Sequence, residues 1–306
     1  MKRFVLMATV VGVVAGVFAA WGLAQPALQA SGASPAATPK KLPPLPAEIK
    51  SRQRWEIGVK CDTPPFGYID VRGKNSGVDV EIARWFARFA FGREQRVRFT
   101  CAPTATREPL LTTNRVDLVI STFSYSADRD TRIDFSRAYY KATGRLLVKN
   151  DSPVQSLNDI RGKRVATTGG SIYDRWMRRC FPSTEVIVVE SVTSALLAFN
   201  QGRADAVMFD DTSLALVAAT DRSAKMTPDL FLASPYGIGI KQGNVALKRW
   251  VDSRLELMRK RDTFLQILRN NFAARFVTGF SKNILRPKNT FGYPPPGAPS
   301  ADTVCP

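Results

Sequence analysis

Short apolar runs alternate with stretches of helical periodicity along most of this chain of 306 residues. Runs such as VRFTC and VDLVIS are typical of buried strands. The stretch DVEIARWFARFAFG places its aromatic side chains on one helical face, with Asp79 as a candidate N-cap and Gly92 as the stop. Strands that alternate with helices in this way predict an α/β fold with mostly parallel sheets, which bind ligands at the carboxyl ends of their strands.

The alternation occurs in two blocks. Residues 53–147 hold the first block and residues 148–237 the second. Residues 238–290 begin with a strand that returns to the first block and continue as long amphipathic helices. The pattern therefore predicts two α/β lobes, the first of them discontinuous, joined by two crossings that form a hinge. Residues 291–306 follow as a proline-rich tail.

The N-terminus carries the features of an export signal. MKR supplies a positive start, and a long apolar core follows it. We expect residues 1–30 to be a signal peptide of the Sec pathway; the alternative is an uncleaved membrane anchor, because the core is nearly long enough to span a bilayer. Residues 31–52 are rich in Pro, Ala and Ser and predict a disordered spacer. Either way we expect the folded part to lie in the periplasm.

The composition excludes several classes of function. With 44 Lys+Arg against 26 Asp+Glu, the formal net charge is +18, which attracts anionic partners. The basic residues are spread along the chain without an Arg-rich run or zinc-finger spacing, so we expect no nucleic-acid binding. Histidine is absent, which excludes Ser-His-Asp and Cys-His activation and HExxH zinc chemistry. We expect a monomer without cofactor or metal.

Several segments in sequence order resemble the extracellular solute-binding proteins of polar amino-acid ABC transporters. They are GVKCDTPPFGY, SGVDVEIARWFA, TREPLLTTNRVDLVISTFSYSADRDTRIDFSRAYY, GRLLVKNDSPVQSLNDIRGKRVATTGGS and LLAFNQGRADAVMFDD. The resemblance extends from about Trp55 to Asn289, and TREPLLTTN and NILRPKNTF are most similar to the glutamate/aspartate-binding branch. It implies a type II periplasmic-binding-protein-like fold, an amino acid held between two lobes, and delivery of that ligand to a membrane permease.

The resemblance also assigns the two residues that would hold the ligand's backbone. Arg129 matches the arginine that pairs with the α-carboxylate, for which a planar guanidinium is suited. Asp210 matches the second-lobe carboxylate that binds the α-ammonium. The alternatives are a surface salt bridge of Arg129 with Asp128 or Asp130, and a helix N-cap for Asp210, although Asp211 suits that role better.

Two loops complete the expected contacts with the ligand. Thr122 and Ser124, in the loop of Arg129, match residues that bond the ligand through a backbone carbonyl and a hydroxyl. The TTGGS loop, with Thr168, Gly170 and Ser171, precedes a helix whose N-terminus can receive an anionic oxygen. A glycine turn alone is weak evidence for binding, so this role depends on the resemblance.

Arg107 and Lys60 are the candidates for side-chain specificity. Both match basic positions of the acidic-amino-acid binders, and a buried ligand carboxylate needs cationic partners. The resemblance therefore favours glutamate or aspartate, although other amino-acid binders carry a base at the position of Lys60. Phe66 is expected to pack against the aliphatic part of the ligand or, equally well, inside the core.

Four cysteines are widely separated, so no CxxC pair exists. Cys61 and Cys101 fall at the ends of strands expected to be neighbours and could pair there. Cys180 could then join Cys305 and hold the tail. Free buried thiols are the alternative.

Two further functions stay open. Some dehydratases resemble these proteins, so a cyclohexadienyl-dehydratase-like enzyme would need a carboxylate of raised pKa in the cleft. Glu108 is the glutamate nearest the expected site, and we expect it to face solvent. The other possibility is a tethered periplasmic sensor or accessory receptor, which the long apolar N-terminus and spacer would suit.

Overall fold

The computed structural model describes residues 42–293 and 304–306. The expected signal peptide or anchor and the spacer up to residue 41 lie outside the described residues. Within the described part, no helix has both the length and the apolar character that a membrane span requires. The expectation of disorder is wrong for residues 47–52. They form helix α1 (Ala47–Arg52), which packs Ile49 into the core of the first lobe.

The first lobe is built on a five-stranded sheet. Its strand order is β5 (Val97–Cys101), β1 (Trp55–Val59), β6 (Leu118–Ile120), β14 (Gly239–Lys241) and β7 (Ile133–Phe135). β1 is parallel to β5 and β6, whereas β14 is antiparallel to β6 and β7. The sheet is therefore mixed rather than mostly parallel, because the segment that returns from the second lobe enters it in the opposite direction.

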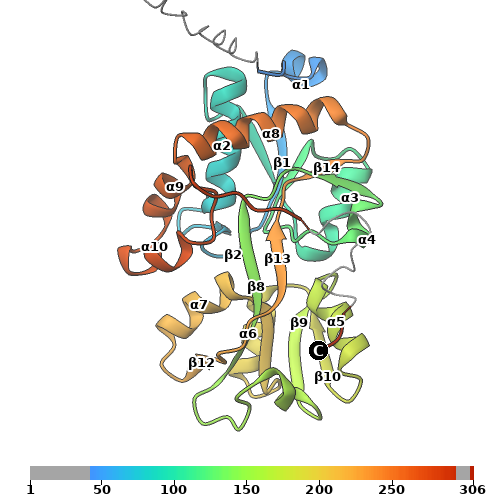
Figure 1. The fold of residues 1–306 in the computed structure, drawn as a ribbon, viewed down its shortest axis with the longest axis vertical. Coiled ribbons are helices and arrows are strands. Elements are labelled where there is room, and N and C mark those ends of the chain that lie inside the picture. Colours follow the sequence, from blue (N-terminus) through green and yellow to red (C-terminus); the bar gives the residue numbers. More distant parts are fainter. Residues whose placement is uncertain (1–41, 294–303) are drawn as a thin grey trace, which may run out of the picture. The chain divides into compact units, whose positions relative to one another are not determined.

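Helices cover this sheet and bury an aromatic core. They are α2 (Val78–Phe91), α3 (Arg107–Thr112), α4 (Ala127–Asp130), α8 (Val245–Lys260), α9 (Thr263–Asn271) and α10 (Ala274–Phe280), with the 3-10 turn η1 (Thr104–Thr106) before α3. The ring of Trp250 on α8 lies 5.2 Å from that of Trp55 and 5.5 Å from that of Phe86. Figure 1 shows α8 crossing this lobe next to α2.

Helix α2 ends at Gly92 as predicted, in a left-handed conformation, but it does not begin as predicted. Its N-cap is Gly77, and Asp79 is a fully buried residue of the first turn. A small sheet of β2 (Asp62–Thr63), β3 (Gly67–Ile69) and β4 (Asn75–Ser76) precedes the helix. Because Asp79 does not cap the helix, its carboxylate can contact other parts of the first lobe.

The second lobe has a six-stranded mixed sheet. Its order is β10 (Glu185–Val189), β9 (Arg164–Thr168), β11 (Ala206–Asp210), β8 (Tyr140–Lys149) and β12 (Ala224–Met226), and β13 (Phe231–Tyr236) also pairs with β8. The helical elements are η2 (Leu157–Ile160), α5 (Ile172–Cys180), α6 (Val192–Asn200) and α7 (Asp211–Thr220). β9 runs parallel to β10 and β11, and β8 runs antiparallel to β11.

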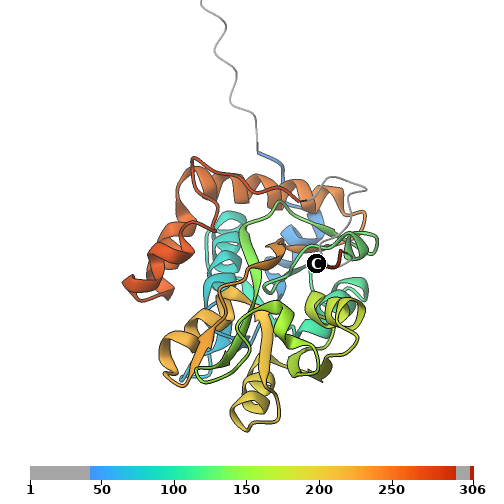
Figure 2. The same cartoon turned by 60° about the horizontal axis from the view of Figure 1, so that its bottom comes forward.

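Strands β8 and β13 connect the lobes as an antiparallel pair (Figures 1 and 2). Tyr140 lies opposite Tyr236 in this pair, and their rings stack at 5.4 Å. The second sheet thus starts at Tyr140 rather than at residue 148, because one long strand both crosses between the lobes and enters the sheet. These are the two predicted crossings.

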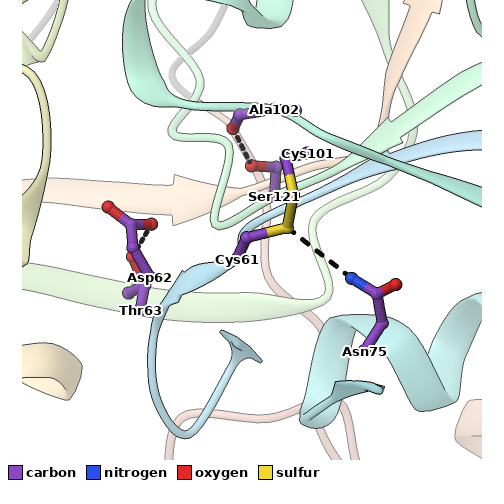
Figure 3. Close-up of a disulfide and its surroundings, with 7 residues drawn as sticks. All are labelled: Cys61, Asp62, Thr63, Asn75, Cys101, Ala102 and Ser121. Carbon is purple, nitrogen blue, oxygen red and sulfur yellow. Dashed lines mark hydrogen bonds between the residues drawn. A yellow bond between two sulfur atoms is a disulfide. The ribbon is translucent and has the colours of Figure 1, made fainter. Parts of the chain in front are cut away.

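Both expected disulfides are present. Cys61 and Cys101 join the ends of the neighbouring strands β1 and β5, with their Cα atoms 5.5 Å apart (Figure 3). Cys180, the last residue of α5, is joined to Cys305, with a Cα–Cα distance of 5.2 Å. The first disulfide immediately follows Lys60, so it braces one edge of the expected site.

Candidate functional site

The carboxyl ends of β1 and β6 carry several buried polar residues. Lys60 directly follows β1, while Thr122 and Ser124 follow β6, and all three side chains are buried. Arg107, at the start of α3, is buried beside them. Parallel strands therefore bring together four of the predicted residues, although the chain separates Lys60 from Ser124 by two helices.

Arg107 holds the loop that carries Thr122. Its Nη1 donates to the carbonyl oxygens of Ser121 and Thr122 at 3.1 and 3.0 Å, and its Nε donates to Thr104 O at 3.1 Å. The guanidinium lies over the ring of Phe123 at 4.4 Å. Its Nη2 makes no hydrogen bond to another described residue. Arg107 thus positions the loop and keeps one amino group for a further partner.

Asp79 is a site residue that the sequence analysis missed. One of its carboxylate oxygens accepts the Thr122 N–H at 2.8 Å, and the other accepts the Tyr139 hydroxyl at 2.8 Å. Thr122 has a φ of 42°, a left-handed conformation that is unfavourable for a β-branched residue. Because its N–H is fixed by Asp79 and its carbonyl by Arg107, the strained backbone is held in place. By local sequence rules this aspartate looks like a helix cap, and only its tertiary contacts show its role.

Arg129 connects the two lobes. Its Nη1 donates to Ser124 O at 2.7 Å within the first lobe, and its Nη2 donates to Gly170 O at 2.7 Å across the cleft. Its Nε lies 3.3 Å from Oε1 of Glu108. Of the two alternative partners considered for Arg129, Asp128 forms a bidentate salt bridge with Arg132, and Asp130 accepts a hydrogen bond from Tyr125.

The expectation that Glu108 faces solvent is wrong. Its carboxylate contacts both Arg129 and Arg132, and its side chain is 23% exposed. Two guanidinium groups attract this carboxylate towards the site. Glu108 therefore helps to orient the arginine that is expected to hold the ligand.

Asp210 supplies the carboxylate of the second lobe. It ends β11, and its Oδ1 accepts the hydroxyl of Tyr173 at 2.6 Å and that of Ser234 at 3.3 Å. Its backbone occupies the N-cap position of α7, but its side chain caps nothing there. Asp211 is not the cap either: it is the first residue of α7 and accepts the Thr143 N–H at 3.3 Å. The side chain of Asp210 is thus held by the hydroxyls of Tyr173 and Ser234 instead of capping the helix.

The TTGGS loop lies against the first lobe. The Thr168 hydroxyl is 3.4 Å from that of Thr104, and the Gly170 carbonyl accepts from Arg129. Ser171 is the N-cap of α5, because its hydroxyl accepts the Asp174 N–H at 3.1 Å. Together with a 3.4 Å bond from Thr193 of the second lobe to the carbonyl of Asp62, these contacts describe a closed cleft.

Phe66 lies in the core of the first lobe. It is completely buried, and its ring contacts those of Tyr140 and Tyr236 edge-on at 5.1 and 5.8 Å. This agrees with the core alternative stated above. Through these rings Phe66 supports the two crossing strands.

The charges of the site influence one another across the cleft. Burial and the nearby Arg107 lower the pKa of Lys60 to about 7, and burial lowers that of Arg107 to about 10. Burial raises the pKa of Asp210, opposed by the hydroxyl of Tyr173 and the charge of Arg107. Within the described residues, no group of three or more Cys, Asp and Glu side chains could hold a metal ion.

A cavity of about 460 Å³ adjoins the site at the rim of the cleft. Cys61, Asp62 and Thr106 line it from the first lobe, and Gly169 and Glu190 line it from the second. None of the ten predicted ligand-binding residues lines this cavity. Cys61 of the Cys61–Cys101 disulfide forms part of its wall.

The sequence matches a known family over most of its length. A profile of the bacterial extracellular solute-binding proteins, family 3, matches residues 56–274. The ABC transporter glutamine-binding protein GlnH of Bacillus subtilis is 30% identical over 215 residues, which are 70% of this chain and 79% of that protein.

Solved structures agree with this match. The cysteine-binding protein from Campylobacter jejuni has a TM-score of 0.72 at 27% identity, covering 74% of this chain and 92% of that one. The ancestral amino acid-binding protein AncCDT-1, a precursor of cyclohexadienyl dehydratase, has a TM-score of 0.68 at 26% identity, covering 74% and 98%. These structures confirm the predicted two-lobed α/β fold, and the ligands in the names of these proteins do not single out glutamate or aspartate.

Proposed function

We propose that this chain, which belongs to the bacterial extracellular solute-binding proteins of family 3, captures an acidic amino acid between its lobes and delivers it to an ABC permease. Arg129 would bind the α-carboxylate and Asp210 the α-ammonium, so that only a zwitterion satisfies both. Because these groups come from opposite lobes, binding and closure would be one event. The protein would act outside the cytoplasmic membrane.

The observation that carries the acidic specificity is the pair of buried cations on the first lobe. Lys60 and Arg107 are 1% and 3% exposed, and neither has a carboxylate within 4 Å among the described residues. A buried cation without a carboxylate partner is costly, so a ligand that brings one is favoured. Arg107 Nη2 and the hydroxyl of Thr122, which bonds to no described residue, are available as donors.

Calorimetric titration of the purified protein against a panel of amino acids tests the proposal. Arg129→Ala should abolish binding of every ligand, since removing one member of a buried charge pair costs about 3–5 kcal/mol. Arg132→Ala is the matched control, because Arg132 lies three residues away and is 45% exposed. If the Arg129 variant binds as tightly as the control, the assigned site is wrong.

A second pair of titrations tests the specificity. Arg107→Gln removes the charge but retains an amide donor for the carbonyls of Ser121 and Thr122. Glutamate should lose at least tenfold more affinity than glutamine in this variant. Equal losses for the two ligands would refute the acidic specificity and leave the receptor function standing.

A dehydratase is the second candidate. It is favoured by the likeness to AncCDT-1 and by the buried carboxyl of Asp79, whose pKa is raised to about 7, a value that suits a general acid. Against it, both oxygens of Asp79 already accept hydrogen bonds from Thr122 and Tyr139. Turnover of prephenate or arogenate by the purified protein would support the enzyme, and amino-acid binding without turnover would support the receptor.

A further inference from the structure

Lys60 is an amine in an unusual position. It ends the central strand β1, and its side chain is almost completely buried. Its Nζ donates to the hydroxyl of Thr104 at 2.7 Å, and this is its one hydrogen bond in the described part of the chain. A hydroxyl is a poor substitute for the water shell of an ammonium ion. The ammonium form therefore needs an anion as its partner, and without one the amine loses its proton.

The charged groups around Lys60 come from four elements. Arg107 of α3 repels the ammonium form, whereas Asp62 of β2, Asp79 of α2 and Asp210 of β11 attract it. None of the three carboxylates forms a salt bridge with Lys60, since Asp79 and Asp210 are engaged by tyrosine hydroxyls and Asp62 by a threonine hydroxyl. Burial is the largest effect and brings the pKa of Lys60 to about 7.

Closure of the cleft completes this environment. The hydroxyl of Thr104 that accepts from Lys60 also contacts the hydroxyl of Thr168, which belongs to the second lobe. The neighbouring Asp62 accepts from Thr193 of the same lobe through its carbonyl. The second lobe thus takes part in removing Lys60 from water. In an open cleft the amine would be hydrated and charged.

We propose that Lys60 couples the choice of ligand to a proton. When the lobes close over a ligand whose side chain brings a carboxylate to Nζ, the ammonium form is retained. When they close over a neutral side chain, Lys60 releases its proton to the solvent and its nitrogen stays neutral. This inference deepens the proposed function and rests on it. Lys60 thereby makes the preference for acidic ligands depend on pH.

Glutamate and glutamine are matched probes because they differ by one charged group. Proton release on binding is measured by calorimetry at pH 8 in two buffers of different ionisation enthalpy. If glutamine binds too weakly for direct titration, its binding is measured in competition with glutamate. The glutamine complex should release close to one proton more than the glutamate complex. A difference of one proton also makes the ratio of association constants, glutamate over glutamine, fall up to tenfold per pH unit above pH 7.5.

Two variants locate the proton. Lys60→Met keeps the length of the side chain and removes the amine, so the difference in proton release should vanish. Lys241→Met is the control, because Lys241 is exposed and bonds to Asn114 far from the cleft. It should retain the full difference.

The outcomes separate this inference from the proposed function. Equal proton release for glutamate and glutamine in the native protein overturns the coupling, even if both bind. If the panel returns only neutral ligands, the acidic specificity fails, and the coupling is still judged by whether those ligands release a proton at pH 8 in the native protein and not in Lys60→Met. Absence of binding by any amino acid overturns the receptor function and the coupling together.

Discussion

Asp79→Asn tests whether the negative charge of the buried Asp79 carboxyl, which contacts the Thr122 loop, lowers the free energy of unfolding. The amide oxygen of asparagine can accept the Thr122 N–H, and its amino group can donate to the Tyr139 oxygen, so both polar neighbours keep a partner. The variant therefore removes the charge with little change in packing. Alanine would instead leave two buried polar groups unpaired, each costing about 1–3 kcal/mol.

The magnitude follows from the pKa. Burial raises the pKa of Asp79 from its ordinary value of 3.8 to about 7. Below pH 3.8 both the folded and the unfolded state bind the proton, and between 3.8 and 7 only the folded state does. The stabilisation is therefore fully present at low pH and is lost as the pH rises through 7. A shift of about three pH units corresponds to on the order of 4 kcal/mol.

Urea unfolding of both proteins between pH 4 and 7.5 measures this effect. Relative to the native protein, the free energy of unfolding of Asp79→Asn should increase by on the order of 4 kcal/mol as the pH rises from 4 to 7.5. Asp70→Asn is the control, because backbone N–H groups of Lys74 and Arg72 lower the pKa of this exposed carboxyl below 3.8, so the difference between native protein and this variant should stay nearly constant from pH 4 to 7.5. A difference between native protein and Asp79→Asn that stays constant with pH would refute the reasoning.

Two further predictions concern the rim of the cleft. Gly170→Ala should weaken ligand binding about fivefold in calorimetry, because an added Cβ would lie 3.1 Å from Ala105 Cα of the closed first lobe. Gly162→Ala is the control, because Gly162 has a similar positive φ but open space around it. It should lose as much stability as Gly170→Ala and keep the affinity of the native protein. Replacing Cys61 and Cys101 by serine should lower the free energy of unfolding by about 2–4 kcal/mol, since the bond closes a loop across 40 residues of sequence separation. Weaker binding of glutamate should accompany that loss, and unchanged affinity would show that the disulfide does not brace Lys60.

The sequence indicated those features that depend on local periodicity. The strand ends that carry Lys60 and Asp210 followed from apolar runs, and helix α2 and its stop at Gly92 followed from its spacing. The course of β8 could not be predicted, because a strand that both crosses between lobes and enters a sheet reads like any other apolar run. The role of Asp79 was missed for a similar reason: an aspartate at a helix start is a good cap by local rules, and only tertiary contacts turn it inward.

A proton on Asp79 is the competing explanation to a proton on Lys60, since burial brings both pKa values to about 7 from opposite directions. An acidic ligand adds a negative charge, which a proton on either group would compensate. The Asp79→Asn variant separates the two, because it keeps the amine and removes the carboxyl. If Lys60 is the group that responds, glutamine must still release one proton more than glutamate from Asp79→Asn at pH 8. If that difference disappears there and persists in Lys60→Met, the coupling belongs to the carboxyl, and the assignment to Lys60 is wrong.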